Sequence, residues 1–349
     1  MAPQPQPVIL SLTRSAIFLV VTVNDGDAAT RAVQGLLADV TSLVRATGFR
    51  RPNGLLSCVV GIGAHVWERL YPGPRPRELA PLQAIDGVHT APSTPGDILF
   101  HIRGMEVDMC FELESNILAR LAGYTKVVDE TPGFRFFDSR DLLGFVDGTE
   151  NPNGIARSEA VLIGDEDPDF TGGSYVITQK YLHDLAKWNA IPVEQQERII
   201  GRKKLSDVEL LDAEKPSYAH NVLNVIEDED GNQLDILRDN MPFGRPAEGE
   251  FGTYFIGYAC TPSRTIRMLR NMFIGLPPGN YDRILDVSTA VTGTLFFVPT
   301  VDMLDATGTP PKPAAEETGT EKSGPEKTGT EKSTPELAGS LGIGSLKGD

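Results

Sequence analysis

The sequence predicts an α+β protein built from two similar halves and followed by a polar tail. Apolar runs typical of buried strands occur in both halves, separated by segments with apolar residues at helical spacing. These elements follow a similar order in each half, whereas the composition beyond residue 299 becomes polar and rich in proline. The 349 residues, 40% of them hydrophobic, suffice for one large domain or two of ordinary size.

The first half is expected to form a β-α-β-β-α-β unit, the ferredoxin-like pattern. Its first strand is a continuous apolar run, AIFLVVTV, and its first helix carries apolar residues three and four positions apart. We predict a flexible segment at 1–10 and a module at 11–131, with strands 16–23, 55–62, 98–102 and 126–129 and helices 27–47 and 107–121.

The second half repeats these kinds of element, which indicates an internal duplication. We predict a second ferredoxin-like module at 174–301, with strands 174–181, 234–238, 253–259 and 293–298 and helices 181–189, 193–200 and 262–274. Between the modules, residues 132–173 are rich in Gly, Asp, Asn and Pro. A connection that long inside a compact protein is either disordered or functional.

The tail divides into a linker and a short apolar end. In 302–336 the string TGTEKS occurs twice, and such polar repeats bury too little apolar surface to become ordered. Apolar residues return within 337–349 as Leu341, Ile343 and Leu346. From the residues alone, a docking peptide and a frayed terminus with chance leucines are equally good interpretations.

Charge and composition exclude several classes of function. The net charge of −16 repels phosphate backbones, which argues against nucleic acid as a partner. The N-terminus lacks the basic start and apolar run of a secretory signal, and no apolar stretch has the length of a membrane span. The sparse Cys58, Cys110 and Cys260 are typical of reduced core thiols. We therefore expect a cytoplasmic protein.

Two polar positions stand out, although each also has a simple structural interpretation. None of the five histidines has the spacing of a helical zinc site, so a lone histidine such as His220 is most simply a hydrogen-bonded structural residue. In LGFVDGTENP, Asp147 is flanked by Gly144 and Gly148. Such a carboxylate serves as a base, a metal ligand or a turn-former, and the turn is the simplest of the three.

A resemblance to a known family favours chemistry at both positions. The string G-x-x-D-G-T at 144–149 is the hallmark of dye-decolourising peroxidases, and similarity to this family extends over about 11–299. His220 follows the motif by about seventy residues, and Arg238 and Asn240 come after it in that order. The resemblance implies two ferredoxin-like modules whose sheets face one another, a dimeric α+β barrel, with haem b in the second.

The resemblance also implies roles for single residues. His220 would be the proximal iron ligand, with Asp282 accepting a hydrogen bond from its ring. On the distal side Asp147 would move a proton between the oxygens of hydrogen peroxide, Arg238 would stabilise the departing oxygen, and Asn240 would orient peroxide or water.

Further expectations concern substrates and partners. The resemblance implies one-electron oxidation of organic substrates such as dyes and phenolics, and electrons would reach large substrates through Trp or Tyr side chains. Trp67 and Trp188 are more simply core residues, and Glu150 could bind Mn²⁺. The lack of a signal and the short loops resemble the compact bacterial subgroup of the family, type B, which tends to form homohexamers. Segment 340–348 resembles the cargo-loading peptide of encapsulin shells, so Leu341, Ile343 and Leu346 would dock inside a nanocompartment.

Two alternatives use the same residues. A haem carrier, or a protein that releases iron from haem, would have the same fold without useful peroxidase turnover. It would need only the ligand and an apolar slot, so Asp147 together with Arg238 favours the enzyme. In a haem-free structural protein, LGFVDGTENP would be only a turn, and the absence of a Soret band would identify that case.

Overall fold

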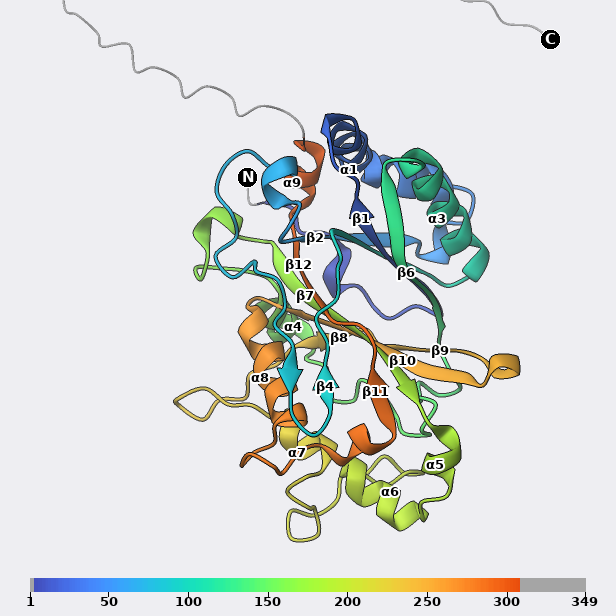
Figure 1. Ribbon diagram of the computed structural model, residues 1–349, viewed down its shortest axis with the longest axis vertical. Helices are drawn as coiled ribbons and strands as arrows, with labels where there is room; N and C mark the ends of the chain where they lie inside the picture. Colours follow the sequence, from blue (N-terminus) through green and yellow to red (C-terminus); the bar gives the residue numbers. More distant parts are fainter. Residues whose placement is uncertain (1–2, 308–349) are drawn as a thin grey trace, which may run out of the picture. The chain divides into compact units, whose positions relative to one another are not determined.

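The computed structural model describes residues 3–307, which form an α+β unit around one ten-stranded antiparallel sheet (Figure 1). The strands are β1 Ser15–Val23, β2 Ser57–Gly63, β3 Ile85–Asp86, β4 Thr90–Ala91, β5 Ile98–Gly104, β6 Thr125–Phe134, β7 Ser174–His183, β8 Leu237–Arg238, β9 Met241–Arg245, β10 Glu250–Ala259, β11 Ser288–Ala290 and β12 Thr294–Val298. The helices are α1 Asp27–Gly48, α2 Trp67–Leu70, α3 Val107–Leu121, α4 Gly154–Val161, α5 Leu185–Asn189, α6 Val193–Ile200, α7 His220–Asn224, α8 Pro262–Phe273 and α9 Val301–Asp305.

The predicted duplication is confirmed by the strand order. Along the sheet the strands run β6-β1-β5-β2-β12-β7-β10-β8. In the first repeat, β1 to β6, and in the second repeat, β7 to β12, the fourth strand lies beside the first, then come the third and the second, which is the ferredoxin-like order. The two repeats join edge to edge, where β12 pairs with β2 through Phe296–Gly63 and Phe297–Ile62.

The helices of the two repeats differ in length. In the first repeat, α1 and α3 are long amphipathic helices of 22 and 15 residues. Figure 1 shows them together beside β1 and β6. Between the first two main strands of the second repeat the chain forms only α5, α6 and α7, of 5, 8 and 5 residues, and long loops. These short helices gather at the opposite end of Figure 1.

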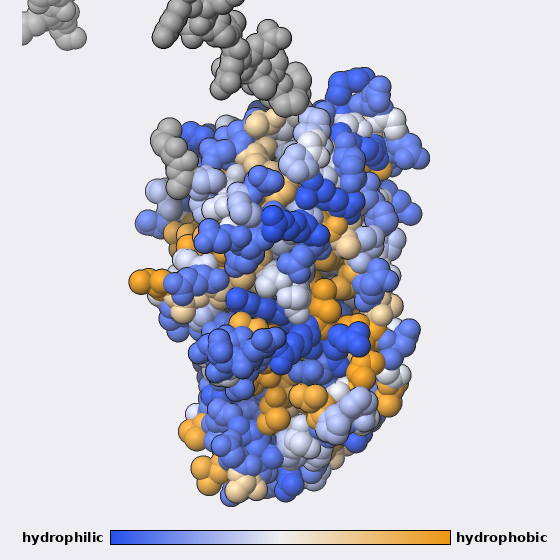
Figure 2. Space-filling model, turned by 90° about the vertical axis from the view of Figure 1, so that its left-hand side faces the viewer, coloured by the Kyte–Doolittle hydropathy of each residue, from blue (hydrophilic) through white to orange (hydrophobic). Residues whose placement is uncertain are grey.

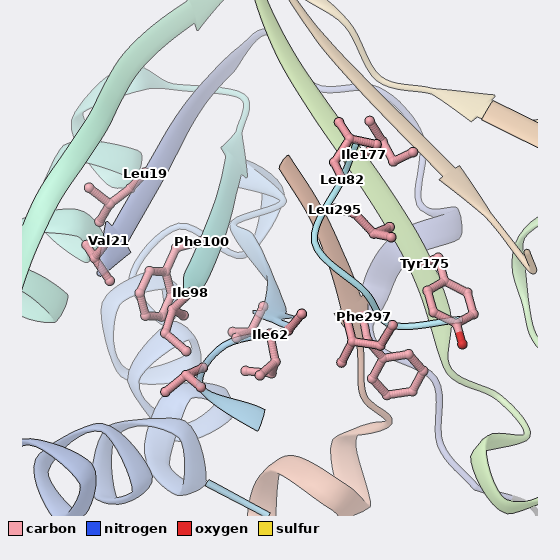
Figure 3. Packing of buried hydrophobic residues seen from close by; sticks show 14 of the residues in the cluster. Leu19, Val21, Ile62, Leu82, Ile98, Phe100, Tyr175, Ile177, Leu295 and Phe297 are labelled. Atoms are coloured by element: carbon pink, nitrogen blue, oxygen red, sulfur yellow. The ribbon is translucent and has the colours of Figure 1, made fainter. Parts of the chain in front are cut away.

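Strand alternation sorts the apolar residues onto two faces of the sheet. Leu19 and Val21 of β1 point to the helix side, where one large cluster runs through both repeats. Figure 3 shows part of this cluster, with Leu19, Val21, Ile62, Ile98 and Phe100 from the first repeat and Tyr175, Ile177, Leu295 and Phe297 from the second.

On the other face the two repeats pack against each other. Phe18 of β1 stacks on Tyr254 of β10 with 4.0 Å between ring centroids, and both side chains are fully buried. A second core cluster combines β1, β2 and β5 with β7, β9 and β10. The sheet therefore folds over so that its halves face each other, as the family resemblance implies.

Both ends of the described chain are more ordered than the sequence predicts. Segment 1–10 was expected to be flexible, but the Gln6 side chain is buried and bonds Val60 N, Val60 O and Pro299 O at 2.8–2.9 Å. The linker was expected from residue 302, but α9 continues to Asp305 and buries Leu304. Long-range contacts of this kind leave no mark in local composition. The linker beyond 307 and the peptide with Leu341, Ile343 and Leu346 lie outside the described residues.

The connection at 132–173 is only partly irregular. Strand β6 runs to Phe134, beyond the predicted boundary, and α4 occupies Gly154–Val161 with Ala160 and Val161 buried. Of the two stretches outside these elements, 135–153 and 162–173, the first contains the glycine-flanked Asp147. The functional interpretation of this connection therefore concerns a shorter segment than the sequence suggested.

The surface and the thiols agree with the composition. On the face drawn in Figure 2 hydrophilic residues predominate, and hydrophobic ones gather in a few small groups between them. Cys58, Cys110 and Cys260 are buried and free, as predicted. Within residues 3–307 no helix combines the length and hydropathy that crossing a membrane requires.

Candidate active site

A cavity of about 370 Å³ lies among β7, β10, the short helices α6 and α7, the longer helix α8 and the segment that carries Asp147. This volume lies within the range of small-molecule and cofactor sites. Much of the lining is apolar, contributed by Leu143, Phe145, Ile200, Ile236, Phe255, Met268, Leu269 and Met272. The polar lining includes His220, Asp147, Arg238 and Asn240, so the structure brings four of the sequence-predicted residues to one cavity.

His220 is the first residue of α7 and is oriented by a buried carboxylate. Its Nδ1 lies 2.7 Å from Asp282 Oδ2, and Asp282 is fully buried. The other oxygen, Oδ1, accepts a 3.0 Å hydrogen bond from Ile284 N, which fixes the carboxylate. Burial is the largest single influence on the pKa of His220 and lowers it, but the charge of Asp282 and its hydrogen bond together raise it more, so the net pKa is raised. With Nδ1 donating to Asp282, the lone pair of Nε2 is available to a metal.

Asp147 is presented by a loop that needs glycine on both sides. Gly144 and Gly148 have φ of +93° and +83°, values that L side chains rarely adopt. The backbone of Asp147 donates a 2.8 Å hydrogen bond to Ser139 O, which closes the loop. The glycines thus let the chain turn sharply enough for Asp147 to line the cavity.

Asn240 links the Asp147 loop to the sheet. Its Nδ2 donates to Asp147 Oδ2 at 3.1 Å, and its Oδ1 accepts from Ile256 N of β10 at 3.1 Å. Both ends of the amide are therefore used, and Asp147 accepts a hydrogen bond that holds its carboxylate in place.

Asn151 is a residue that sequence reasoning missed. Its Oδ1 accepts from Arg238 N at 2.9 Å, and its Nδ2 donates to Arg238 O at 2.8 Å. This side chain therefore clamps the backbone of Arg238 to the segment that carries Asp147. Asn151 belongs to the motif string DGTENP, which marks it as a candidate. Its hydrogen bonds to the backbone of Arg238, far away in the sequence, could not be predicted from that string.

Asp141, which lines the cavity, is a second residue that the sequence did not indicate. Its Oδ1 accepts from Phe145 N at 2.9 Å, so it shapes the turn before Asp147. Burial raises the pKa of Asp141 to about 7, and the nearby Asp147 charge adds to this, although the Phe145 hydrogen bond opposes it. A carboxyl group that holds its proton near neutrality can sit beside Asp147 without strong repulsion.

Other polar residues near the cavity are already paired. His183 lines it, but its ring nitrogens lie 2.8 Å from Ser288 Oγ and 2.9 Å from Thr253 Oγ1, and burial lowers its pKa to about 4. These contacts are typical of a structural histidine. Glu150, considered for Mn²⁺, forms a 2.8 Å ion pair with Arg202 Nη1. Across the described residues, no group of three or more His, Cys, Asp or Glu side chains could hold a metal ion.

Both tryptophans are core residues, as predicted. Trp67 and Trp188 are at most 1% exposed. Trp188 donates from Nε1 to Leu143 O at 2.9 Å, so it supports the chain that leads into the Asp147 loop. Trp67 lies in the first repeat, where it stacks on Tyr71.

The fold and this cavity define a class of protein that can hold a planar cofactor through a single imidazole. The apolar walls suit a large hydrophobic ring, and His220 with its carboxylate partner would be a suitable ligand for the iron of such a ring. Arg238 Nε is buried without a hydrogen-bond partner among residues 3–307, which leaves a cationic donor at the cavity for an anionic or polar ligand.

Comparison with known proteins identifies the family. The family model described as Dyp-type peroxidase, N-terminal, matches residues 5–135, and the model described as Dyp-type peroxidase, C-terminal, matches residues 138–303. The chain therefore belongs to the Dyp-type peroxidase family.

Its relatives match over nearly the whole chain. A dye-decolorizing peroxidase from Rhodococcus erythropolis is 56% identical, covering 98% of this chain and 97% of the relative. The crystal structure of DyPB from Rhodococcus jostii matches with a TM-score of 0.86 at 54% identity, covering 88% of this chain and 99% of that one. The encapsulated DyP-type peroxidase from Mycobacterium smegmatis, solved by cryo-EM, has a TM-score of 0.85 and 60% identity, covering 87% of this chain and 98% of that one.

Proposed function

We propose that His220 holds haem in this cavity and that Asp147, Arg238 and Asn240 activate hydrogen peroxide beside it. Haem is the cofactor, consistent with structures of the R. jostii relative in complex with heme. The observation that carries the proposal is that two hydrogen bonds orient polar side chains at the same cavity. One joins His220 to Asp282 at 2.7 Å, and the other joins Asn240 to Asp147 at 3.1 Å.

Each residue contributes a different part of the chemistry. Haem, when bound, supplies redox-active iron that takes up the oxidising equivalents of peroxide. His220 binds through Nε2, while Asp282 holds the ring and increases its basicity. Asp147 accepts a proton from one peroxide oxygen and returns it to the other, which departs as water. Arg238 donates hydrogen bonds to the departing oxygen as negative charge develops on it.

Variants at the distal residues test this assignment. Because Asp147→Asn removes the proton acceptor but retains the shape, we expect kcat/KM for peroxide to fall by about 10²–10³-fold. Arg238→Ala should cause a comparable loss, and the haem content of both proteins should match the wild type. Stopped-flow mixing with peroxide, normalised to haem, measures both. Rates within twofold of the wild type in both variants would refute the assignment.

The same measurement separates the enzyme from a carrier of the same fold. A carrier needs His220 and the apolar walls but gains nothing from a hydrogen-bonded Asp147 and the half-buried guanidinium of Arg238. Family membership and these two residues support turnover with peroxide and organic reducing substrates. For Mn²⁺ the support is weaker. A variant of the R. jostii relative was solved in complex with manganese, whereas Glu150 of this chain is paired with Arg202.

We further propose that the protein is a cytoplasmic homohexamer packaged inside an encapsulin shell. The encapsulated relative from M. smegmatis supports this, as does the likeness of segment 340–348 to a cargo-loading peptide. Docking of Leu341, Ile343 and Leu346 would gain affinity from several tails on one oligomer. A chain truncated before Leu337 should keep its turnover but no longer co-purify with the shell. Retained packaging would refute the docking role, and light scattering would test for six chains.

A further inference from the structure

A buried ionic cluster lies where the two repeats face each other, outside the cavity. Arg103 of β5, in the first repeat, forms an ion pair through Nη1 with Asp239 Oδ2 of the second repeat. Both residues are 1% exposed. His101, two residues before Arg103 on the same face of β5, places Nε2 3.8 Å from the same oxygen. Arg103 also donates to Pro7 O, so the cluster includes the N-terminal segment.

Asp239 lies in the sequence between Arg238 and Asn240, two of the predicted site residues. Arg238 ends β8, and Asp239 and Asn240 connect it to Met241 at the start of β9. Successive side chains along a strand point to opposite sides. Arg238 and Asn240 line the cavity, whereas Asp239 does not. Its side chain instead reaches the first repeat, and its N–H donates to Ile256 O at 3.1 Å.

We propose that Asp239 is a positioning residue and that its ion pair with Arg103 of the first repeat holds Arg238 and Asn240 in register with Asp147. A buried carboxylate and guanidinium cannot separate without leaving an uncompensated charge, so the pair resists any sliding or rotation of the Arg238–Asn240 segment. The pair thus gives the first repeat, which contributes none of the predicted site residues, a direct part in the geometry of the site.

The neighbours of the pair are arranged to keep it intact. Tyr258 Oη lies 2.7 Å from His101 Nδ1, and both side chains are fully buried. Burial and the nearby Arg103 charge hold the pKa of His101 well below its usual range, so the ring is neutral. A neutral ring does not compete with Arg103 for the Asp239 charge, which leaves the guanidinium as the cation that pairs with it.

Cyanide binding to the haem-loaded protein tests the inference without turnover. Cyanide binds as an anion after its acid loses a proton, so its affinity reports on the placement of Asp147, Arg238 and Asn240 together. Asp239→Asn keeps the side-chain shape but breaks the ion pair. Since a misplacement of about 1 Å can cost ~10²-fold, we expect its cyanide Kd, measured by absorption titration, to rise at least about tenfold. Its kcat/KM for peroxide should fall in parallel, with unchanged haem content.

Because Asp239→Asn leaves Arg103 buried and unpaired, a second variant guards against misfolding. The double variant Arg103→Gln/Asp239→Asn leaves no unpaired charge, so it should fold and show the same loss of cyanide affinity. The control is Asp129→Asn, which breaks a different ion pair between the repeats. That pair is half-buried and joins Asp129 Oδ1 to Lys180 Nζ at 3.7 Å. This variant should bind cyanide as the wild type does.

The inference rests on the proposed roles of the distal residues, and Arg238→Ala separates the two. If Arg238→Ala leaves cyanide affinity unchanged, the proposed function of Arg238 fails and the positioning role fails with it. If Arg238→Ala weakens binding but the folded double variant stays within twofold of the wild type, only the positioning role of Asp239 is overturned. Weakened binding in Asp129→Asn would also overturn it, because any inter-repeat pair would then have the same effect.

Discussion

The two repeats share one strand order but use it differently. In the first, α1 and α3 cover the sheet with apolar side chains, and Leu36, Leu37, Leu113 and Ile117 are fully buried. In the second, the chain between β7 and β8 forms only short helices and loops, and a cavity of about 370 Å³ remains. The first repeat is thus a filled copy of the fold, and the second is a hollow one.

This difference shows that the strand order does not create the site. The cavity lies among the connections of the second repeat, and the side chains for which we propose chemistry, such as Asp147, His220 and Arg238, lie on connections and at strand ends. The filled repeat provides rigidity, because a packed core cannot rearrange without losing contacts. The predictions below test this division of roles, starting with the largest expected effect.

Removing the proposed iron ligand should affect the hollow repeat alone. In His220→Ala, the loss of a ligand worth about 3 kcal/mol or more weakens haem binding by ~100-fold or more, and turnover should fall with it. The Soret absorbance of the purified protein and peroxide-dependent dye oxidation measure this. His65→Ala, at an exposed histidine of the first repeat, is the control and should behave as the wild type does. A His220→Ala protein with full colour and turnover would contradict the site.

Truncating matched leucines should reveal the difference in packing. Leu37 on α1 and Leu269 on α8 are both buried, but only Leu269 lines the cavity. A buried Leu→Ala change costs about 2–5 kcal/mol, with the higher values where a new void opens in a packed core. In the haem-free protein we therefore expect Leu37→Ala to cost about twice as much as Leu269→Ala. Urea unfolding measures both, and equal costs would mean that the repeats are packed alike.

A buried carboxyl group in the filled repeat should affect stability but not turnover. Burial raises the pKa of Glu114 on α3 to about 7, and the Glu130 charge adds to this. The folded protein then keeps a proton that the unfolded chain releases at its ordinary pKa of about 4.3. Stability should therefore fall as pH rises from about 4.3 to about 7.

Replacing that group with a neutral one should remove the pH effect. Between about pH 4 and pH 8, Glu114→Gln should gain on the order of 1–3 kcal/mol relative to the wild type, since one pKa unit corresponds to about 1.4 kcal/mol. Unfolding curves at several pH values measure the gain, and the activity should not change. A difference that does not vary with pH would show that Glu114 ionises normally.

Two glycines with the same backbone conformation should separate strain from function. Gly123 of the first repeat and Gly148 of the second have φ of +82° and +83°. A Cβ at Gly123 would meet nothing within 4 Å, whereas at Gly148 it would lie 3.2 Å from Asn151 Nδ2. Each Gly→Ala change should cost about 1–2 kcal/mol in backbone strain. Only Gly148→Ala should also lower the haem-normalised turnover, several-fold, because it disturbs the clamp on Arg238.

The sequence predicted what depends on local pattern or on a known motif. Apolar runs and helical spacing located the strands and long helices, and the resemblance identified Asp147, His220, Arg238, Asn240 and Asp282, which the structure places at or beside one cavity. Their roles remain predictions. Contacts between distant segments could not be predicted. Asn151 bonds a backbone 87 residues away, and Gln6, in a proline-rich end, bonds β2 and the chain after β12.

The alternation at Arg238, Asp239 and Asn240 limits how this stretch of chain can change in length. Inserting or deleting one residue before Arg238 would exchange the two sides of the extended segment. The Asp239 carboxylate would then face the cavity, and after an insertion the Arg238 guanidinium would lie against Arg103 in the buried region between the repeats. One such change would therefore damage the core and the site together. This short segment should tolerate some single substitutions far better than the insertion or deletion of one residue.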